Sequence, residues 1–374
     1  MSRFDELVPE HVRALSAYVP GKPVRAAERE SGVRCVKLAS NENPFGPSPL
    51  AVEAMARAAA GSNFYPDNDN LELRLRLAQR AGLAPENVLV TPGSTGFLDI
   101  IARTLLRPGL KAVTSERTFI VYAMVVRAAG GTLVQAPMRG HGFDLDAIAR
   151  SIDSHTRVVF LANPNNPTGT MFDAAAMDAF LERVPAHVLV VLDEAYSDFA
   201  DDYAARHRRR WSRSLEYVRE GRQIVVLRTF SKAHGLAGAR VGYGYAPEQV
   251  VQHFARVRPA FAVSNVSEAA AVAALEDAEH VRRAVENNVA GVAWLEPRLR
   301  ELGLQPAPTS ANFIYFEVPG PGAAMAKRIQ EAGVIVRPLT AWGAPNALRV
   351  TVGTPEQNQQ FLAALKKALE RVPA

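Results

Sequence analysis

Four short apolar segments in the middle of the chain are each followed by side chains that can do chemistry. The segments are 88–91, 157–161, 188–192 and 224–227, and the loops after them are 92–96, 163–169, 193–196 and 229–232. Lys232 closely follows the fourth segment, so its amine is expected to be partly desolvated, which lowers its pKa and makes it a nucleophile. Asp193 directly follows the third, and a carboxylate at the end of a buried strand is costly unless it is paired.

These apolar segments are expected to be strands of one sheet. They are continuous rather than alternating runs, which is typical of strands covered on both faces. Helical patterns separate them, and strands that alternate with helices predict a mostly parallel α/β sheet. Because ligands of such sheets bind at the carboxyl ends of the strands, we expect the four loops to form one site.

An amine, a carboxylate and an anion-binding turn are what pyridoxal 5′-phosphate (PLP) requires of a protein. Its aldehyde needs a lysine, here Lys232, and its pyridine nitrogen stays protonated beside a carboxylate, here Asp193. Its phosphate suits the N–H groups of a helix N-terminus, for which the turn 93–96 is placed. Ser231 and Arg240 could reach the same phosphate. Taken singly, each feature has an ordinary interpretation as a strand–helix turn, a helix cap or a surface turn.

Together these segments resemble the fold-type-I aminotransferases, and in particular the histidinol-phosphate aminotransferase family. The central motifs stand in the family's order: Asn-Pro-Asn-Asn-Pro-Thr-Gly at 163–169, Asp-Glu-Ala-Tyr at 193–196, and Ser-Lys at 231–232 followed by Arg240. Further matching pieces are Ala-Ser-Asn-Glu-Asn-Pro at 39–44, Tyr-Pro-Asp at 65–67, Asn-Phe at 312–313, Val-Arg-Pro at 336–338 and Leu-Arg-Val-Thr-Val-Gly at 348–353. The resemblance covers nearly the whole chain and implies PLP as the cofactor.

The resemblance also implies a role for each matching residue. Lys232 is the catalytic residue that forms the Schiff base and moves the proton. The cofactor-binding residues are Asp193 at the pyridinium nitrogen, Tyr196 and Asn166 at the phenolate oxygen, Phe119 on the ring, Ser94, Thr95, Ser231 and Arg240 at the phosphate, and Tyr65 from the neighbouring subunit. The substrate-binding residues are Tyr18, Asn41, Arg337 and Arg349. Many family members have a tyrosine where this chain has Phe119, so ring stacking is kept while a hydroxyl is lost.

The implied reaction is a ping-pong transamination from histidinol phosphate to 2-oxoglutarate, giving imidazole-acetol phosphate and glutamate in histidine biosynthesis. Arg337 and Arg349 would bind the phosphate of this donor. The same arginines would bind the carboxylate of phenylalanine or tyrosine, so an aromatic aminotransferase is the alternative. A PLP-dependent decarboxylase of a phosphorylated amino acid is more distant.

Two other classes fit the sequence poorly. A PLP-binding transcription regulator needs a DNA-binding domain, and no length for one is expected before Leu38. A Ser-Lys hydrolase needs an S-x-x-K spacing, whereas Ser231 is adjacent to Lys232.

The resemblance implies an α/β fold of two domains, a large one with a mostly parallel seven-stranded sheet between helices and a smaller α+β domain. Residues 1–40 are expected to form an arm that packs with the small domain, and 41–260 the large PLP-binding domain. Residues 261–374 are expected to form the small domain, with one helical stretch at 266–302, strands at 312–317, 334–336 and 348–352, and a closing helix at 355–370. Because Tyr65 is assigned to the neighbour's site, we expect a homodimer with shared active sites.

Composition adds weaker constraints on location and partners. Cys35 is the single cysteine of 374 residues, and the chain shows neither a signal-like N-terminus nor an apolar run of 18 residues, which predicts a cytoplasmic protein without a membrane partner. The net charge is +5, with a basic cluster at 206–213. No nucleic-acid motif accompanies the cluster, so a solvated surface is favoured over nucleic-acid binding. Neither HExxH nor CxxC occurs, so no metal site is expected.

Overall fold

The computed structural model describes residues 4–17 and 21–370. A seven-stranded sheet lies at the centre of its larger unit. The strand order is β2 (Val88–Thr91), β10 (Gly242–Tyr245), β9 (Ile224–Thr229), β8 (Leu189–Asp193), β7 (Thr156–Ala162), β3 (Lys111–Ser115) and β4 (Thr132–Ala136). Strand β10 runs antiparallel to both of its neighbours, while the other neighbouring pairs are parallel. The prediction of a mostly parallel seven-stranded sheet is confirmed.

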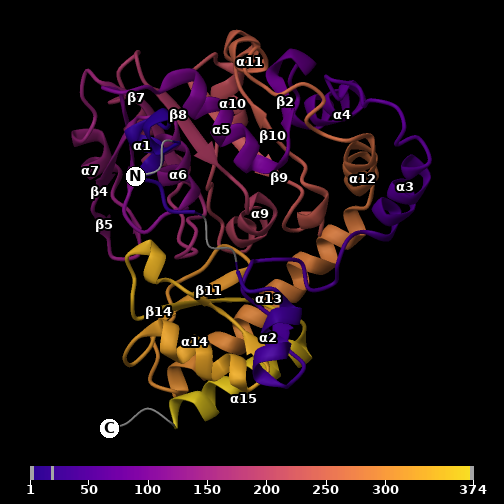
Figure 1. Ribbon diagram of the computed structural model, residues 1–374, viewed down its shortest axis with the longest axis vertical. Coiled ribbons are helices and arrows are strands. Elements are labelled where there is room, and N and C mark those ends of the chain that lie inside the picture. Colours follow the sequence, from indigo (N-terminus) through magenta and orange to yellow (C-terminus); the bar gives the residue numbers. More distant parts are fainter. Residues whose placement is uncertain (1–3, 18–20, 371–374) are drawn as a thin grey trace.

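Both faces of this sheet are covered by helices (Figure 1). Successive side chains of a strand point to opposite faces, so Val190 and Leu192 lie in one core cluster while Leu189 and Val191 lie in the other. The first cluster is closed by α3 (Pro49–Ala59), α4 (Leu71–Ala81), α7 (Leu145–Arg150), α8 (Ala174–Leu181), α10 (Ser214–Arg219) and α12 (Asn265–Glu276). The second is closed by α5 (Gly93–Leu105), α6 (Val121–Ala128) and α11 (Glu248–Ala255). This double cover explains why the strands read as continuous apolar runs.

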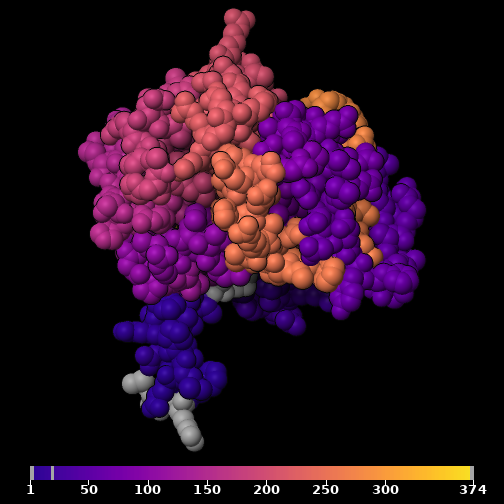
Figure 2. Space-filling view, turned by 90° about the horizontal axis from the view of Figure 1, so that it is seen from above, coloured from indigo at the N-terminus to yellow at the C-terminus, as the bar shows by residue number. Residues whose placement is uncertain are grey.

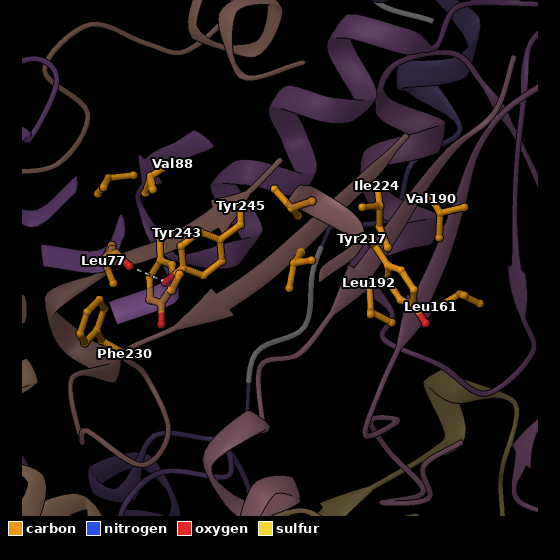
Figure 3. Close-up of a cluster of buried hydrophobic side chains, with 14 of the residues drawn as sticks. Leu77, Val88, Leu161, Val190, Leu192, Tyr217, Ile224, Phe230, Tyr243 and Tyr245 are labelled. Atoms are coloured by element: carbon orange, nitrogen blue, oxygen red, sulfur yellow. Dashed lines mark hydrogen bonds between the residues drawn. The ribbon is translucent and has the colours of Figure 1, made fainter. Parts of the chain in front are cut away.

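The first core cluster reaches from α4 across to α10 (Figure 3). Tyr217 of α10 packs over the strand residues Leu192 and Ile224, and all three side chains are buried. At the other end, the Tyr245 hydroxyl donates a hydrogen bond of 3.3 Å to the carbonyl oxygen of Leu77. The cluster therefore ties the antiparallel strand β10 to the helix before β2.

A smaller α/β unit lies below the large sheet (Figure 1). Its antiparallel sheet has the order β11 (Phe313–Glu317), β14 (Ala347–Thr351), β13 (Arg337–Pro338), and its helices are α13 (Ala278–Glu301), α14 (Gly322–Glu331) and α15 (Pro355–Leu369). Ile314, Phe316 and Phe361 are fully buried in its core. The single helix expected at 266–302 is in fact α12 and α13. Asp277 separates them because its backbone is not helical and its side chain caps α13 by accepting from the N–H of His280 at 3.1 Å.

The N-terminal residues contact both units. Helix α1 (Glu10–Arg13) packs on α6, α2 (Val24–Ser31) packs on α14, and β1 (Val36–Lys37) pairs in parallel with β12 (Val334–Ile335). The first described residues, in indigo, project from the body of the molecule (Figure 2). Domain limits at 40 and 260 stay predictions.

The remaining elements are short. They are a hairpin of β5 (Met138–Arg139) and β6 (Gly142–Phe143), α9 (Ser197–Arg206), and the 3₁₀ turns η1 (Asp5–Leu7), η2 (Pro85–Asn87), η3 (Ala237–Ala239) and η4 (Thr340–Trp342). None of the helices within 4–17 and 21–370 is long and apolar enough to cross a membrane.

Much of the basic cluster at 206–213 is neutralised by neighbouring acids. Arg206 pairs with Asp202 at 2.7 Å, and Arg213 binds Asp178 at 3.0 Å and Glu216 at 2.8 Å. This pairing agrees with a solvated surface.

Gly244 of β10 has no side chain, so the Phe97 ring of α5 can pack directly on the sheet. A Cβ at this position of β10 would lie 2.5 Å from the Phe97 ring and 3.0 Å from Leu227. We expect Gly244→Ala to lower the free energy of unfolding by about 1–3 kcal/mol, because both neighbours must move. Urea unfolding would measure this against Gly238→Ala, whose added Cβ meets nothing within 4 Å. Equal stability of the two variants would contradict the tight packing.

Candidate active site

A cavity of about 190 Å³ lies at the edge of the large sheet where β2, β7, β8 and β9 end. Nine of the residues expected at the cofactor line it: Ser94, Thr95, Phe119, Asn166, Asp193, Tyr196, Ser231, Lys232 and Arg240. The four loops singled out in the sequence therefore meet in one cavity. The role of each residue in it stays a prediction.

One wall of the cavity is the N-terminus of α5. This helix begins at Gly93, so the glycine-containing turn at 93–96 is itself the first turn of the helix. The residue before it, Pro92, supplies no side-chain cap. The first N–H groups of α5, which no helical carbonyl can satisfy, thus face the side of the cavity that Ser94 and Thr95 line.

Arg240 is brought to the same wall by the antiparallel strand. Gly242 of β10 pairs with Thr91 of β2 and Thr229 of β9, so β10 begins where these two strands end. Gly93 has a φ of 69°, and a Cβ on it would lie 2.5 Å from Nη2 of Arg240, so the guanidinium rests directly on the first turn of α5.

Ser231 completes this wall with a hydroxyl group. The Thr229 hydroxyl donates to the Ser231 oxygen at 2.9 Å, so the hydroxyl hydrogen of Ser231 can be donated to an anion. A cation, a hydroxyl and an uncapped helix N-terminus together fit a phosphate group.

Asp193 sits at the end of β8 with 4% of its surface exposed. Its Oδ2 accepts a hydrogen bond of 2.9 Å from the Tyr122 hydroxyl, and its Oδ1 accepts one of 3.2 Å from the backbone N–H of Ala195. Burial raises the pKa of Asp193 to about 6, against the opposing effects of the Tyr122 hydrogen bond and the Lys232 charge. A cationic ring nitrogen beside this carboxylate would keep it ionised.

Lys232 extends into the cavity from the loop after β9. Its Nζ donates to the backbone carbonyl of Ser40 at 3.3 Å and lies 5.6 Å from the centre of the Tyr196 ring. Burial, helped by the positive charge of Arg349 and opposed by Glu42, lowers the pKa of Lys232 to about 8. A substantial fraction of the amine is therefore neutral near physiological pH, as a nucleophile must be.

Hydrogen bonds tie the smaller unit to the cavity. Arg349 of β14 donates from Nη1 to Oδ1 of Asn166 and from Nη2 to the carbonyl oxygen of Ala39, the latter at 2.8 Å. Asn41 donates to the Tyr196 hydroxyl at 2.8 Å. Arg349 and Asn41 thus contact cavity residues without lining the cavity themselves.

The loop that carries Asn166 is held in place at both ends. The side chain of Asn165 accepts from the Thr118 hydroxyl at 2.8 Å and donates to the carbonyl of Arg117 at 3.1 Å. Gly169 has a φ of 79°, and a Cβ there would lie 2.3 Å from Oγ1 of Thr309, so this turn requires glycine.

Three residues expected at the site lie elsewhere or cannot be placed. Arg337 lines a larger neighbouring cavity of about 1240 Å³, which shares Phe119 with the smaller one. Tyr65 is 83% exposed, stacks on Phe261 at 4.7 Å and does not line the cavity of its own chain, and its assignment to the neighbouring subunit's site stays a prediction. Tyr18 lies outside the described residues.

Several residues of the site were not singled out in the sequence. Glu42, Ser40 and Thr229 line the cavity, and Tyr122 binds Asp193 from behind it. No local sequence pattern marks Tyr122, because Phe119 lies before the start of α6 and the hydrogen bond to Asp193 joins residues 71 positions apart. Glu42 and Ser40 belong to the segment 39–44, which matched the family motif.

The cavity therefore joins an amine, a buried carboxylate and an anion-binding wall at the carboxyl edge of an α/β sheet. This is the arrangement of a PLP-dependent enzyme. The family model "Aminotransferase class I and II" matches residues 33–365, and this chain belongs to that family. The aminotransferase class and the cofactor PLP predicted from the sequence are confirmed.

Similar proteins and structures cover nearly the whole chain. "Histidinol-phosphate aminotransferase 2" of Nitrosospira multiformis is 42% identical over 98% of this chain and 92% of its own length. "Histidinol-phosphate aminotransferase" of Akkermansia muciniphila is 44% identical over 96% and 98%. The crystal structure of histidinol-phosphate aminotransferase from Sinorhizobium meliloti in complex with PLP superposes with a TM-score of 0.88 at 28% identity, covering 99% of this chain and 98% of that one. The family resemblance seen in the sequence is confirmed.

The buried ammonium of Lys232 should make the cofactor-free protein less stable below pH 8. The folded pKa of about 8 lies below the ordinary 10.5, so the unfolded chain binds more protons between these values and stability rises with pH in that window. We expect the stability advantage of Lys232→Met over the wild type to shrink by about 3 kcal/mol between pH 7.5 and 10.5. Urea unfolding of both apoproteins at several pH values measures it.

Lys366→Met is the matched control, since Lys366 is exposed on α15. Its effect on stability should vary little over the same pH range. A pH-independent effect of Lys232→Met would show that the amine is not desolvated in the folded chain.

Proposed function

We propose that this aminotransferase moves the amino group of histidinol phosphate to 2-oxoglutarate, as part of histidine biosynthesis. The observation that carries the donor assignment is the placement of two arginines opposite each other, Arg337 on β13 and Arg349 on β14. The names of the relatives that are 42% and 44% identical support the same donor.

Directly opposite residues of an antiparallel pair point to the same face of the sheet, with Cβ atoms about 5 Å apart. Two guanidinium groups in such positions can both donate hydrogen bonds to one anion that lies between or above them. Arg349 reaches Asn166 at the cofactor cavity, and Arg337 lies over the Trp342 ring at 4.9 Å and lines the larger cavity. The two cations therefore span the distance from the reacting centre to the cavity in which the distal end of a donor would lie.

The residues around the smaller cavity fit PLP. The α5 N-terminus, Ser231 and Arg240 would hold its phosphate, Asp193 its ring nitrogen, and Phe119 one face of its ring. When bound, PLP supplies an aldehyde that carries the amino group and a cationic ring that withdraws electrons from the substrate Cα.

Lys232 is the residue that would move the proton. Its Nζ is near the Tyr196 ring and donates a hydrogen bond of 3.3 Å to the backbone of Ser40, which a small movement of the side chain toward a substrate would release. With a pKa of about 8, part of the Lys232 amine is neutral near physiological pH, so its Nζ could accept a proton from the substrate Cα and hold it.

A homodimer with shared sites, located in the cytoplasm, belongs to the same proposal. Tyr65 and Phe64 are 83% and 72% exposed, and Phe261 beside them is also exposed. The segment is rigidly held, because Asn68 accepts from the N–H of Phe261 at 2.9 Å and Asp69 pairs with Arg258 at 2.8 Å. Figure 2 shows the orange residues that follow α11 beside the violet residues of α3 and α4. Fixed, exposed aromatic rings of this kind are typical of a protein interface.

Single donors distinguish the possible substrates. The PLP-loaded protein is mixed separately with histidinol phosphate, phenylalanine, tyrosine, histidine and glutamate, and the loss of yellow absorbance is followed without an acceptor. We expect fast conversion with histidinol phosphate, whose phosphate can bind both arginines, and conversion at least about 100-fold slower with phenylalanine and tyrosine, which carry no phosphate. Glutamate should also convert fast, because it is the product of the second half-reaction. Faster conversion with the aromatic donors would make the chain an aromatic aminotransferase.

Arg337→Met tests the phosphate contact itself. It should lower kcat/KM for histidinol phosphate by about 10- to 100-fold, the cost of losing a charged hydrogen bond, while the PLP absorbance is unchanged. Arg127→Met removes another arginine from the wall of the same large cavity and should have little effect. Equal effects of the two substitutions would indicate that the positive charge of the cavity attracts the donor in general, and not that Arg337 contacts its phosphate.

Mixing two impaired variants at a PLP concentration too low to saturate Tyr65→Ala tests the shared site. We expect Lys232→Ala to abolish turnover and Tyr65→Ala to weaken PLP binding. In a mixture, dimers that contain one subunit of each kind have one site with both residues intact, so part of the activity should return. Sedimentation gives the oligomeric state of each sample. A monomer with full activity, or a mixture that regains none, would rule out the shared site.

A further inference from the structure

We propose that Tyr122 is a positioning residue that holds the Asp193 carboxylate and the Phe119 ring where the cofactor ring needs them. The inference rests on the proposed roles of Asp193 and Phe119. Tyr122 lies at the start of α6, behind the wall of the smaller cavity, and its side chain is fully buried.

The hydrogen bond from Tyr122 to Asp193 is well defined. The Tyr122 hydroxyl donates to Oδ2 at 2.9 Å, and the N–H of Ala195 donates to Oδ1 at 3.2 Å. With one donor on each oxygen, the carboxyl group cannot rotate without losing both bonds. Each oxygen accepts a second hydrogen bond readily, so the carboxylate can still meet a cationic ring nitrogen.

The Tyr122 ring is fixed by two other aromatic rings. It stacks on Phe160 of β7 at 4.9 Å with an interplanar angle of 11°, and it meets Phe119 edge to face at 5.6 Å and 88°. Phe119 lines the cofactor cavity. One tyrosine therefore sets both the group that would pair with the ring nitrogen and the ring that would stack on the face of the cofactor.

Electrostatics make this hydrogen bond important for Asp193. Among the described titratable groups that act on Asp193, Lys232 favours its charged form, while Tyr196 carries no charge near neutral pH because burial raises its pKa to about 12. The neighbouring Glu194 disfavours a charge on Asp193.

The negative charge of Glu194 is compensated by neighbouring donors. It accepts from Arg228 at 2.8 Å and from the Ser212 hydroxyl at 2.6 Å. Burial and the Asp193 charge hold the pKa of Tyr122 well above 10, so the Tyr122 hydroxyl remains a donor.

Tyr122→Phe removes the hydroxyl and leaves the ring. We expect the PLP dissociation constant to rise about 10-fold, as for the loss of one hydrogen bond to a charged group. The difference from the wild type should grow as the pH falls from 8 to 6, because an unassisted, buried Asp193 takes up a proton more readily. Equilibrium titration with PLP, followed by absorbance without any substrate, measures both effects.

Tyr217→Phe is the matched control. The Tyr217 hydroxyl donates to Asp178 at 2.7 Å, the same kind of bond in a part of the large unit that does not line the cofactor cavity. Its PLP affinity and pH profile should equal those of the wild type. The proposal is overturned if Tyr122→Phe also binds PLP like the wild type at every pH.

A double-mutant cycle tests whether Tyr122 acts through Asp193. Asp193→Asn should itself weaken PLP binding, and adding Tyr122→Phe to it should then cost much less than 10-fold. An undiminished effect in the Asp193→Asn background would overturn the proposal. If Asp193→Asn alone binds PLP normally, the role of Asp193 in the proposed function fails instead.

Phe160→Leu tests the hydrogen bond between Tyr122 and Asp193 without removing either bonding group. It loosens the ring on which Tyr122 stacks and leaves both bonding groups in place, so PLP should bind about threefold more weakly, with the same pH trend. Thermal melting of each apoprotein shows whether it is folded. Should Tyr122→Phe not fold, unchanged PLP binding by a folded Phe160→Leu variant would overturn the proposal.

Discussion

The structure of this site depends on the burial of an acid and an amine at the same edge of the sheet. Asp193 ends the central strand β8 with almost no exposed surface, and Lys232 reaches into the same cavity from the next loop. Burial shifts the pKa of Asp193 up to about 6 and that of Lys232 down to about 8, so each group is moved toward its neutral form. The charged form of each group is costly when it is buried alone, and a cofactor with a cationic nitrogen and an aldehyde would compensate both groups.

The rest of the large unit compensates for this burial. Tyr122 and the N–H of Ala195 each donate to one oxygen of Asp193, and Arg228 neutralises Glu194, which would otherwise place a second buried charge next to it. This compensation requires rigid neighbours, because a buried carboxylate loses its stabilising hydrogen bond when the donor moves away and no water replaces it. The aromatic contacts of Tyr122 supply that rigidity.

The antiparallel direction of β10 brings a cation, Arg240, to the N-terminus of α5. In a fully parallel sheet, every strand would end at the edge where the cofactor binds and begin at the other. By entering the sheet at this edge between β2 and β9, β10 places Arg240 over Gly93. The smaller unit contributes in a similar way, since Arg349 reaches from β14 to Asn166.

Much of this arrangement follows from the sequence alone. Continuous apolar runs predict strands covered on both faces, and polar loops after such strands predict a site at their carboxyl ends, because both features depend only on local pattern and on the geometry of parallel sheets. The order of the motifs predicted the family and the cofactor, and Lys232 and Asp193 could be singled out because a charged residue directly after a buried strand is costly.

Only the tertiary structure decided which distant residues meet. The sequence indicated neither that Tyr122 binds Asp193 nor that Arg240 rests on the first turn of α5. These features depend on strand order, on side-chain direction and on packing between segments more than 50 residues apart, and single-chain patterns of polarity carry no record of them.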